Sequence, residues 1–155
     1  MKRLTLIKHA PGAPGLRILG LGPNLLPSEG LSKLKSFLEQ HAFWASNRNL
    51  KDLRQVLSGS SAVITLWRGK RLIGFGRATS DGIYRAVLWD VVIANDSQGQ
   101  GLGRQIVEAL LATPPLRKVE KVYLMTTNCT AFYKQLGFES CPDQSLLRRI
   151  KSIKN

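Results

Sequence analysis

A glycine-rich run at residues 98–104 combines residue types that suit the binding of a phosphate group. Gly99, Gly101 and Gly103 remove side chains from a turn, so backbone N–H groups can point at an anion. The helical pattern that follows adds a favourable dipole, and Arg104 adds a positive charge. We therefore predict a phosphate-binding loop here. A turn without a ligand stays open as the alternative, because GxGxG matches neither the dinucleotide-binding fingerprint nor the P-loop.

Cysteine and histidine residues give no comparable pattern. Cys129 and Cys141 lack metal-ligand spacing and offer no disulfide framework, which favours a reducing compartment such as the cytoplasm or a plastid stroma. Cys129 precedes an expected helix, where a thiol can be activated, although an inert buried cysteine is also typical. We assign no catalytic role to His9 or His41, and we predict no metal site.

The segments before residue 60 are expected to supply short strands and two helices that precede the main sheet. Leu31, Leu34, Phe37 and Leu38 recur at helical spacing and indicate the core-facing side of one helix. The expected elements are strands at 2–8 and 17–21, an irregular segment at 10–15, a helix from just after Ser28 to about Gln40, and a helix at 49–57.

The rest of the chain is expected to form the sheet that positions the glycine run. The predicted elements are a meander at 62–67, 72–79 and 84–93, a helix from 98 to Pro114, a strand at 119–125, a helix at 130–136 and a last strand at 146–150. This order predicts an α/β fold of the α+β type, a mixed sheet with helices on its faces. The length suits a single domain over residues 1–155.

The net charge of +13 is spread along the chain. Residues 1–60 hold nine basic and three acidic residues, giving +6, and residues 61–155 hold fourteen and seven, giving +7. An evenly basic surface attracts polyanions such as a nucleotide cofactor, RNA or an acidic protein surface, or it simply favours solubility. No apolar run approaches the ~20 residues that cross a bilayer, so no membrane partner is predicted.

Two motifs in order carry a resemblance to a known family. Residues 98–103, Gln-Gly-Gln-Gly-Leu-Gly, match the Q/R-x-x-G-x-G/A motif with which GNAT N-acetyltransferases hold the pyrophosphate of coenzyme A. Residues 131–138 are similar to the family's second motif, a helix with the pattern FY-x-x-x-GF. The segments 76–81 and 89–91 resemble the cyanobacterial and plastid branch that includes chloroplast serotonin N-acetyltransferases. The resemblance implies a GNAT-like fold, a central mixed β-sheet flanked by about four helices.

The same resemblance implies acetyl-CoA as the cosubstrate and no metal. Strand 91–93 would part from strand 119–125 and expose backbone groups that bind the pantetheine amides and polarise the thioester carbonyl. Thr126 stands where the family often has asparagine, so Asn128 is expected to contact the cofactor instead or to cap the next helix. The expected cofactor-binding residues are Val91, Val92, Ile93, Gln98, Gly99, Gln100, Gly101, Leu102, Gly103, Arg104, Asn128 and Tyr133.

Catalytic roles also follow from the resemblance. Tyr133 in the second motif is the implied general acid, because its hydroxyl can donate a hydrogen bond to the departing thiolate. With ordinary pKa values of ~10 for tyrosine and ~8.5 for a thiol, that hydrogen bond matters more than full proton transfer. Asp90, a charged residue in an apolar strand, is the nearest candidate for the base that deprotonates the amine. The alternative for Asp90 is a structural partner for an arginine or a backbone group.

The predicted function is therefore direct acetyl transfer to a primary amine, and the branch resemblance favours an arylalkylamine such as serotonin. Phe43 and Trp44 are expected in the acceptor lobe. Protein lysines or N-termini are the alternative acceptors. From another class, the alternative is a non-catalytic basic module that binds RNA or protein, although a nucleic-acid partner is not favoured. The sequence predicts no oligomeric state.

Overall fold

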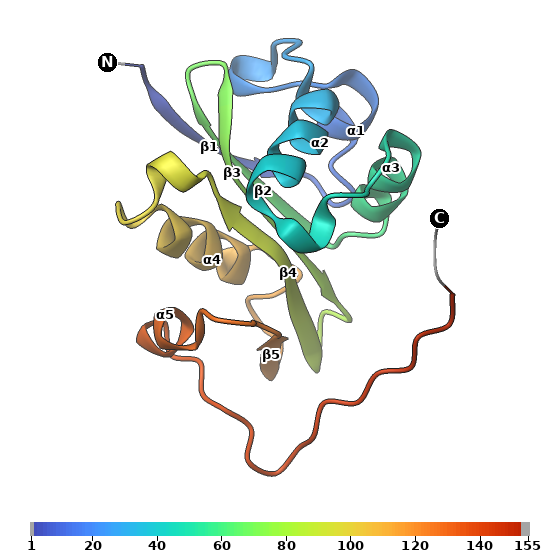
Figure 1. Ribbon diagram of the computed structural model, residues 1–155, viewed down its shortest axis with the longest axis vertical. Helices are drawn as coiled ribbons and strands as arrows, with labels where there is room; N and C mark the ends of the chain where they lie inside the picture. The colour runs from blue at the N-terminus through green and yellow to red at the C-terminus, as the bar shows by residue number, and fades with distance from the viewer. Residues whose placement is uncertain (1, 153–155) are drawn as a thin grey trace. The chain divides into compact units, whose positions relative to one another are not determined.

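The computed structural model describes residues 2–152, which fall into two compact units. The first unit ends at Met125 and holds the sheet with most of the helices (Figure 1). The second unit begins at Thr126 and holds one short helix followed by chain without regular secondary structure. Each unit is described separately below.

The first unit is built on a five-stranded mixed sheet in the order β1-β2-β3-β4-β5, which confirms the predicted sheet type. Neighbouring strands are antiparallel from β1 to β4, and β5 runs parallel to β4. The strands are β1 Leu4–His9, β2 Ala62–Arg68, β3 Arg71–Ser80, β4 Arg85–Ile93 and β5 Lys121–Leu124.

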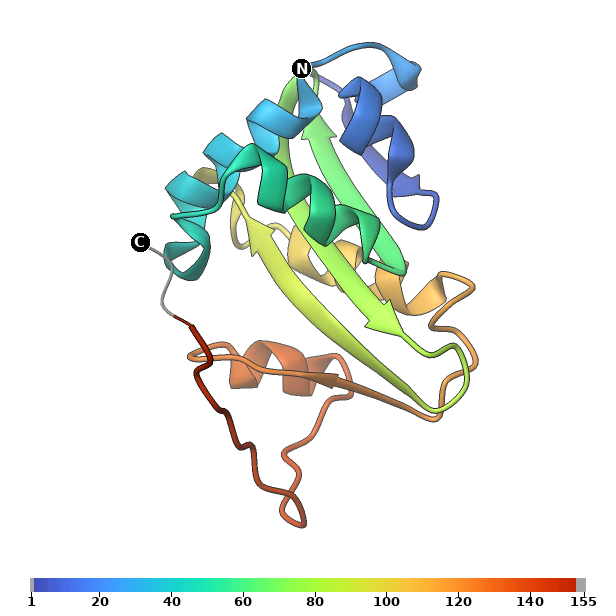
Figure 2. The ribbon, with the colours of Figure 1, turned by 90° about the vertical axis from the view of Figure 1, so that its right-hand side faces the viewer.

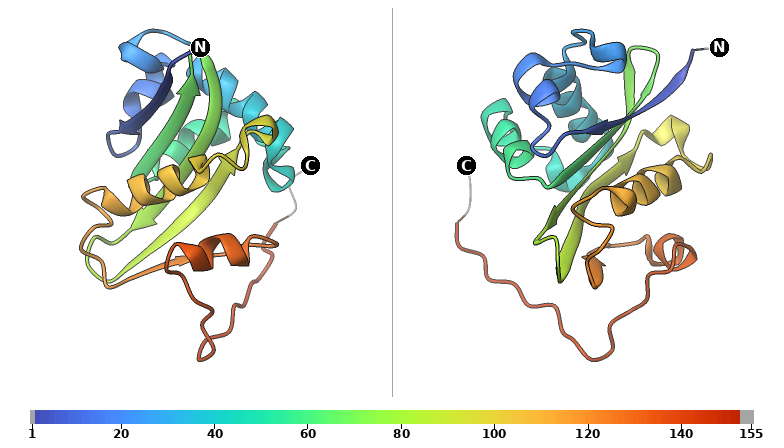
Figure 3. Two further views of the ribbon diagram at one scale, coloured as in Figure 1. Left: turned by 90° about the vertical axis from the view of Figure 1, so that its left-hand side faces the viewer. Right: turned by 180° about the vertical axis from the view of Figure 1, so that it is seen from behind.

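Helices cover both faces of this sheet. Helices α1 (Pro14–Leu19), α2 (Gly30–His41) and α3 (Leu50–Ser58) lie on one face, and α4 (Leu102–Ala112) lies on the other (Figures 2 and 3). Six successive residues of β2, from Ala62 to Trp67, are buried, as expected for a strand covered on both sides.

Two glycines allow α4 to approach the sheet closely. A Cβ atom on Gly74 or on Gly76 would lie 2.7 Å from a methyl carbon of Ile106, a distance that real side chains do not reach. Ile106 is fully buried in the middle of α4. The lack of a side chain at these two positions of β3 therefore lets α4 pack directly on the backbone of the strand.

The prediction was wrong near the N-terminus. Residues 17–21 were expected as a strand and 10–15 as irregular, but α1 runs from Pro14 to Leu19. Pro14 occupies the first helical turn, and Gly20, with a φ of 63°, ends the helix. Leu16 is fully buried, and packing of its side chain favours a short helix over an extended segment.

The second unit also differs from the prediction. Helix α5 spans Thr130–Gln135, close to the predicted 130–136, but the expected strand at 146–150 has no regular secondary structure. Leu146, Leu147 and Ile150 are 76%, 88% and 71% exposed. Arg148 and Arg149 interrupt the apolar residues, so the segment has no alternating face to bury.

Candidate active site

Strand β4 has an edge that is only half paired. Its residues Arg85 to Leu88 pair with Lys121 to Leu124 of β5, and β5 ends there. Within residues 2–152, no strand follows β4 from Trp89 to Ile93 on this side. This agrees with the expectation that 91–93 part from the neighbouring strand, and it leaves backbone groups of β4 available to a ligand.

A β-bulge lies at the start of this unpaired stretch. Phe75 pairs with Val92 and Arg77 with Trp89, so Asp90 and Val91 together oppose the single residue Gly76. Asp90 has a φ of 54°, in the left-handed region that a non-glycine residue rarely adopts. Such bulges bend a strand and change the direction of its groups, and here the bulge coincides with the unpaired part of β4.

Asp90 is held by side chains from two directions. Arg48 donates from Nη1 to Oδ2 at 2.8 Å and from Nη2 to Oδ1 at 3.0 Å. Arg77 on β3 donates from Nε to Oδ2 at 2.8 Å. The indole Nε1 of Trp44, in the 3₁₀ helix Phe43–Ala45, donates to Oδ1 at 3.2 Å. The carboxylate side chain is only 5% exposed, so these donors replace its hydration.

These contacts argue against the expected role of Asp90 as the base that deprotonates the amine. Burial alone would raise the pKa of its carboxyl, but the hydrogen bonds and charges of Arg48 and then Arg77 hold the pKa below its ordinary value. A carboxylate with a lowered pKa and occupied oxygens is a poor acceptor for the proton of an amine. The geometry corresponds to the alternative in which Asp90 is a structural partner of arginine.

The glycine run forms an open turn at the start of α4. A 3₁₀ helix, Asn95–Ser97, leads into it, and Gly99 and Gly101 have φ values of 78° and 76°. A Cβ atom at either glycine would meet nothing within 4 Å, so the turn borders open space. The first turn of α4 has no side-chain cap and no acidic residue. Its N–H groups therefore remain suited to an anionic ligand.

The side chains of the run contribute less than its backbone. Arg104 donates from Nε to Glu108 at 2.8 Å, which offsets part of its charge. Gln98 donates to the Ile93 carbonyl oxygen at 3.3 Å, and Gln100 accepts from Arg68 at 3.4 Å. Leu102 is buried, so only its backbone could face a cofactor. Binding of a phosphate here would depend on main-chain donors.

The second unit holds the two other predicted site residues, Tyr133 and Asn128. Tyr133 lies against Phe132 and Phe138, with ring centroids 4.9 Å and 5.7 Å away. Burial, and to a lesser degree the charge of Cys129, raises the pKa of Tyr133 to about 12, so its hydroxyl keeps its proton at neutral pH. Asn128 accepts a contact from the Cys129 thiol at 3.3 Å and does not cap α5.

Sequence reasoning missed Arg48 and the contacts of both histidines. His41 accepts the backbone N–H of Asn95 on Nδ1 at 3.2 Å, and His9 Nε2 lies 2.7 Å from the Thr65 hydroxyl. Burial lowers the pKa of His9 to about 4. The sequence held only a general signal for Arg48, namely that a buried aspartate such as Asp90 needs a positively charged partner. In residues 2–152, no group of three or more His, Cys, Asp or Glu residues could hold a metal ion.

Comparison with curated proteins gives relatives named as acetyltransferases. An uncharacterized N-acetyltransferase of Pyropia yezoensis is 39% identical over 101 residues, which cover 62% of this chain and 58% of the relative. A histone acetyltransferase of Glycine max is 43% identical over 75 residues, 48% of this chain and 32% of the relative. The chloroplastic serotonin N-acetyltransferase 2 of Oryza sativa is 40% identical over 74 residues, which cover 47% of this chain and 37% of the relative. The chain therefore spans less than two thirds of each relative.

Solved structures show the same fold. A probable acetyltransferase of Staphylococcus aureus superposes with a TM-score of 0.72 over 97% of this chain and 100% of that one, at 20% identity. No helix in the described chain has the length and apolar character to cross a membrane. The family model described as an acetyltransferase (GNAT) domain matches residues 59–140, more than half of the sequence. The chain thus belongs to the GNAT acetyltransferase family.

Proposed function

We propose that this protein transfers an acetyl group from acetyl-CoA to a primary amine. The observation that carries the proposal is the combination, within one unit, of an unpaired β4 edge and the uncapped glycine turn of α4. The first offers main-chain groups for an extended ligand, and the second offers N–H donors for its phosphates. Membership of the GNAT family supports this use of the two features.

The residues present fit acetyl-CoA. Gly99 and Gly101 leave space that a Cβ atom would narrow, and no acidic residue in the first turn of α4 would repel a pyrophosphate. We propose that the backbone of residues 98–104 holds the pyrophosphate and that Val91, Val92 and Ile93 hold the pantetheine arm. Asn128 and Tyr133 are proposed as further cofactor contacts, as the two family motifs imply. When bound, acetyl-CoA supplies the activated acetyl thioester.

Tyr133 is the proposed donor to the leaving sulfur. With its pKa raised to about 12, compared with ~8.5 for a thiol, full proton transfer would be uphill by roughly 5 kcal/mol. A protonated hydroxyl can instead donate a hydrogen bond where negative charge develops. The raised pKa therefore supports stabilisation of the thiolate rather than its complete protonation.

Asp90 is proposed as a positioning residue rather than a base. Its contacts with Arg48, Arg77 and Trp44 join the loop before α3 to the bulge of β4. The low pKa supports this role, and we propose that water takes the proton of the amine. Substitution of Asp90 should then change the geometry of β4. The pH dependence that comes from deprotonation of the amine should stay the same.

An arylalkylamine is the proposed acceptor. Phe43 and Trp44 are 74% and 52% exposed and meet edge to face with ring centroids 5.1 Å apart. Trp44 also donates a hydrogen bond to Asp90, so this aromatic pair contacts the strand that we assign to the cofactor. Burying an aromatic ring against it would contribute ~1.5–3 kcal/mol. The serotonin N-acetyltransferase among the relatives supports the same choice.

Protein lysine is a second candidate acceptor, favoured by the histone acetyltransferase among the relatives. The charge of +13 counts against it, because a basic enzyme repels a polycationic peptide at long range. We also propose that the protein acts in the cytoplasm, or in a plastid stroma if it is plastid-encoded. The chloroplastic serotonin N-acetyltransferase among the relatives supports the plastid setting.

Acceptor preference distinguishes these candidates. We expect kcat/KM for serotonin to exceed that for spermidine and for a lysine-rich peptide at matched ionic strength. Trp44→Ala should raise KM for serotonin, while Tyr84→Ala, at another exposed aromatic residue, should leave it unchanged. A higher kcat/KM for the peptide would move the assignment to protein acetylation.

A further inference from the structure

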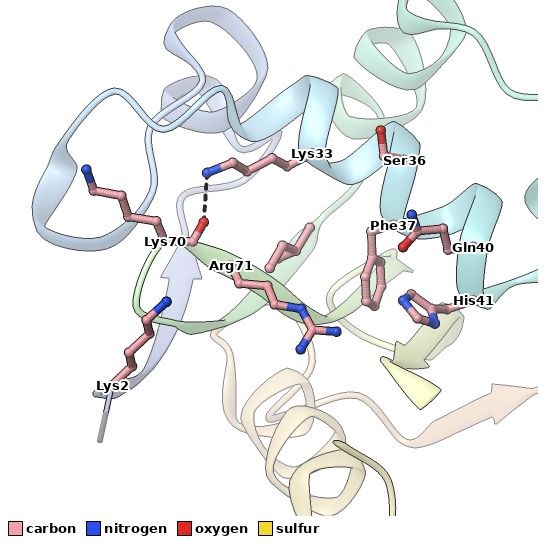
Figure 4. Close-up of a pocket in the computed structure, with 9 residues that line it drawn as sticks. Lys2, Lys33, Ser36, Phe37, Gln40, His41, Lys70 and Arg71 are labelled. Atoms are coloured by element: carbon pink, nitrogen blue, oxygen red, sulfur yellow. Dashed lines mark hydrogen bonds between the residues drawn. The ribbon is translucent and has the colours of Figure 1, made fainter. Parts of the chain in front are cut away.

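A groove lies between α2 and the start of β3, within the first unit (Figure 4). Its volume of about 400 Å³ suits a small molecule. None of the glycine-turn residues 98–104 lines it, so it is separate from the site described above. The lining residues are Lys2, Lys33, Ser36, Phe37, Gln40, His41, Lys70, Arg71 and Leu72.

The charge of this groove is of one sign. Three lysines and an arginine line it, and its lining includes no aspartate or glutamate. The positive charge of Arg71 is offset by Asp96, to which Arg71 donates two hydrogen bonds of 2.9 Å. The charges of Lys2, Lys33 and Lys70 have no carboxylate among the ion pairs of the described chain. Three cations around one small volume favour a multiply charged anion over chloride.

Lys33 is held in place before any ligand arrives. Lys33 donates to the carbonyl oxygen of Lys70 at 2.7 Å and lies 5.8 Å from the centre of the Trp67 ring. Figure 4 marks this contact with a dashed line. Lys33 therefore keeps its ammonium at the main chain of Lys70, and its further N–H groups can donate to a ligand. Such preorganisation lowers the entropy that a ligand must remove on binding.

The opposite end of the groove is lined by both apolar and polar side chains. Phe37 and Leu72 are only 4% and 5% exposed and form its apolar surface. His41 lies against Phe37, with ring centroids 5.0 Å apart. Because His41 accepts the Asn95 N–H on Nδ1, its other ring nitrogen is the one that carries a proton and can donate. This end suits the body of a ligand rather than its charged group.

We propose that this groove binds the phosphate group of a small molecule, with Lys33 and Lys70 as the principal charged contacts. A phosphate monoester is multiply charged and offers three oxygen acceptors, which matches the lysines at one end. The phosphate can belong to a separate metabolite or to the 3′-phosphate of coenzyme A. The proposal does not depend on acetyl transfer, because binding of a phosphate is measured without turnover.

The test is a calorimetric titration of the full chain with inorganic phosphate and with pyrophosphate at constant ionic strength, in which binding at the groove is the part that the Gly101→Asp variant retains. Saturable binding is expected, and Lys33→Gln combined with Lys70→Gln should weaken it by roughly tenfold or more. The pair Lys51→Gln and Lys118→Gln, at exposed lysines outside the groove, makes the same change in net charge and should leave binding nearly unchanged. Lys33→Arg with Lys70→Arg should retain it, which controls for loss of folding.

Two further arms identify the source of the phosphate. If saturating coenzyme A abolishes phosphate binding at the groove and 3′-dephospho-coenzyme A does not, the groove holds the cofactor's 3′-phosphate. If phosphate binds with unchanged affinity in the presence of coenzyme A, the ligand is a separate molecule. Absence of saturable binding, or equal weakening by the groove pair and the control pair, would overturn the proposal.

Discussion

Arg77 on β3 donates from Nε to Oδ2 of Asp90 at 2.8 Å, across the bulge in β4. The bond joins a buried carboxylate to the strand opposite, at the residue whose backbone has a positive φ. A strained backbone conformation persists only where its surroundings hold it. This ion pair and that with Arg48 therefore connect the bulge to the elements around it.

Asp90→Asn should destabilise the protein by about 3 kcal/mol, because it leaves two arginine charges beside a neutral side chain in a mostly buried site. Urea denaturation measures the change. Asp96→Asn is the matched control, since Asp96 also receives two hydrogen bonds from one arginine but is 61% exposed. We expect the control to change stability very little. Equal effects of both variants would show that Asp90 does not hold the bulge.

His9 should make stability depend on pH. Burial lowers its pKa from an ordinary ~6.5 to about 4, so the unfolded chain binds a proton between these values while the folded protein does not. The free energy of unfolding should therefore fall as the pH drops from about 6.5 to 4, by up to roughly 3 kcal/mol. His9→Gln should remove this part of the slope. An unchanged slope in that variant would assign it to other groups.

Tyr133→Phe should lower kcat by about a hundredfold and leave acetyl-CoA affinity nearly intact, because the hydroxyl acts when the thiolate departs. Steady-state kinetics and calorimetric binding give the two values. Tyr84→Phe removes a hydroxyl from an exposed tyrosine in the first unit and should have no effect. Normal turnover by the Tyr133→Phe variant would exclude Tyr133 from the mechanism.

Gly101→Asp should abolish the rise in melting temperature that acetyl-CoA produces, because it places a carboxylate where we propose the pyrophosphate binds. Gly82→Asp is a close control. Gly82 has a φ of 79°, and a Cβ atom there also meets nothing within 4 Å, so both variants impose the same backbone strain. Only the variant at Gly101 should lose the shift. Loss in both variants would point to general destabilisation.

The glycine turn was predictable because its conformation requires a particular residue type. Gly99 and Gly101 both have positive φ, and the change to helical spacing after them marks the start of α4. The β2–β3–β4 meander was predictable for a similar reason, since its strands are local in sequence and joined by tight turns. Local signals therefore identified the elements that carry the proposed cofactor site.

Long-range contacts were not predictable in this way. Arg48 and Asp90 are 42 positions apart, and the sequence holds 23 lysine and arginine residues that could have paired with the carboxylate. Leu16 is buried by contacts that form only in the folded protein. These contacts favour the helix α1 where a strand was expected at 17–21. Packing across the molecule decided both cases, and neither leaves a pattern in a single sequence.

The most direct measurement is product formation by purified protein mixed with acetyl-CoA and serotonin. We predict release of free coenzyme A, detected as thiol, in equal amount to N-acetylserotonin identified by mass spectrometry, with turnover well above the rate without protein. If acetyl-CoA neither binds nor yields any acetylated amine, with serotonin, spermidine or a lysine peptide as the acceptor, the assignment as an amine acetyltransferase is wrong.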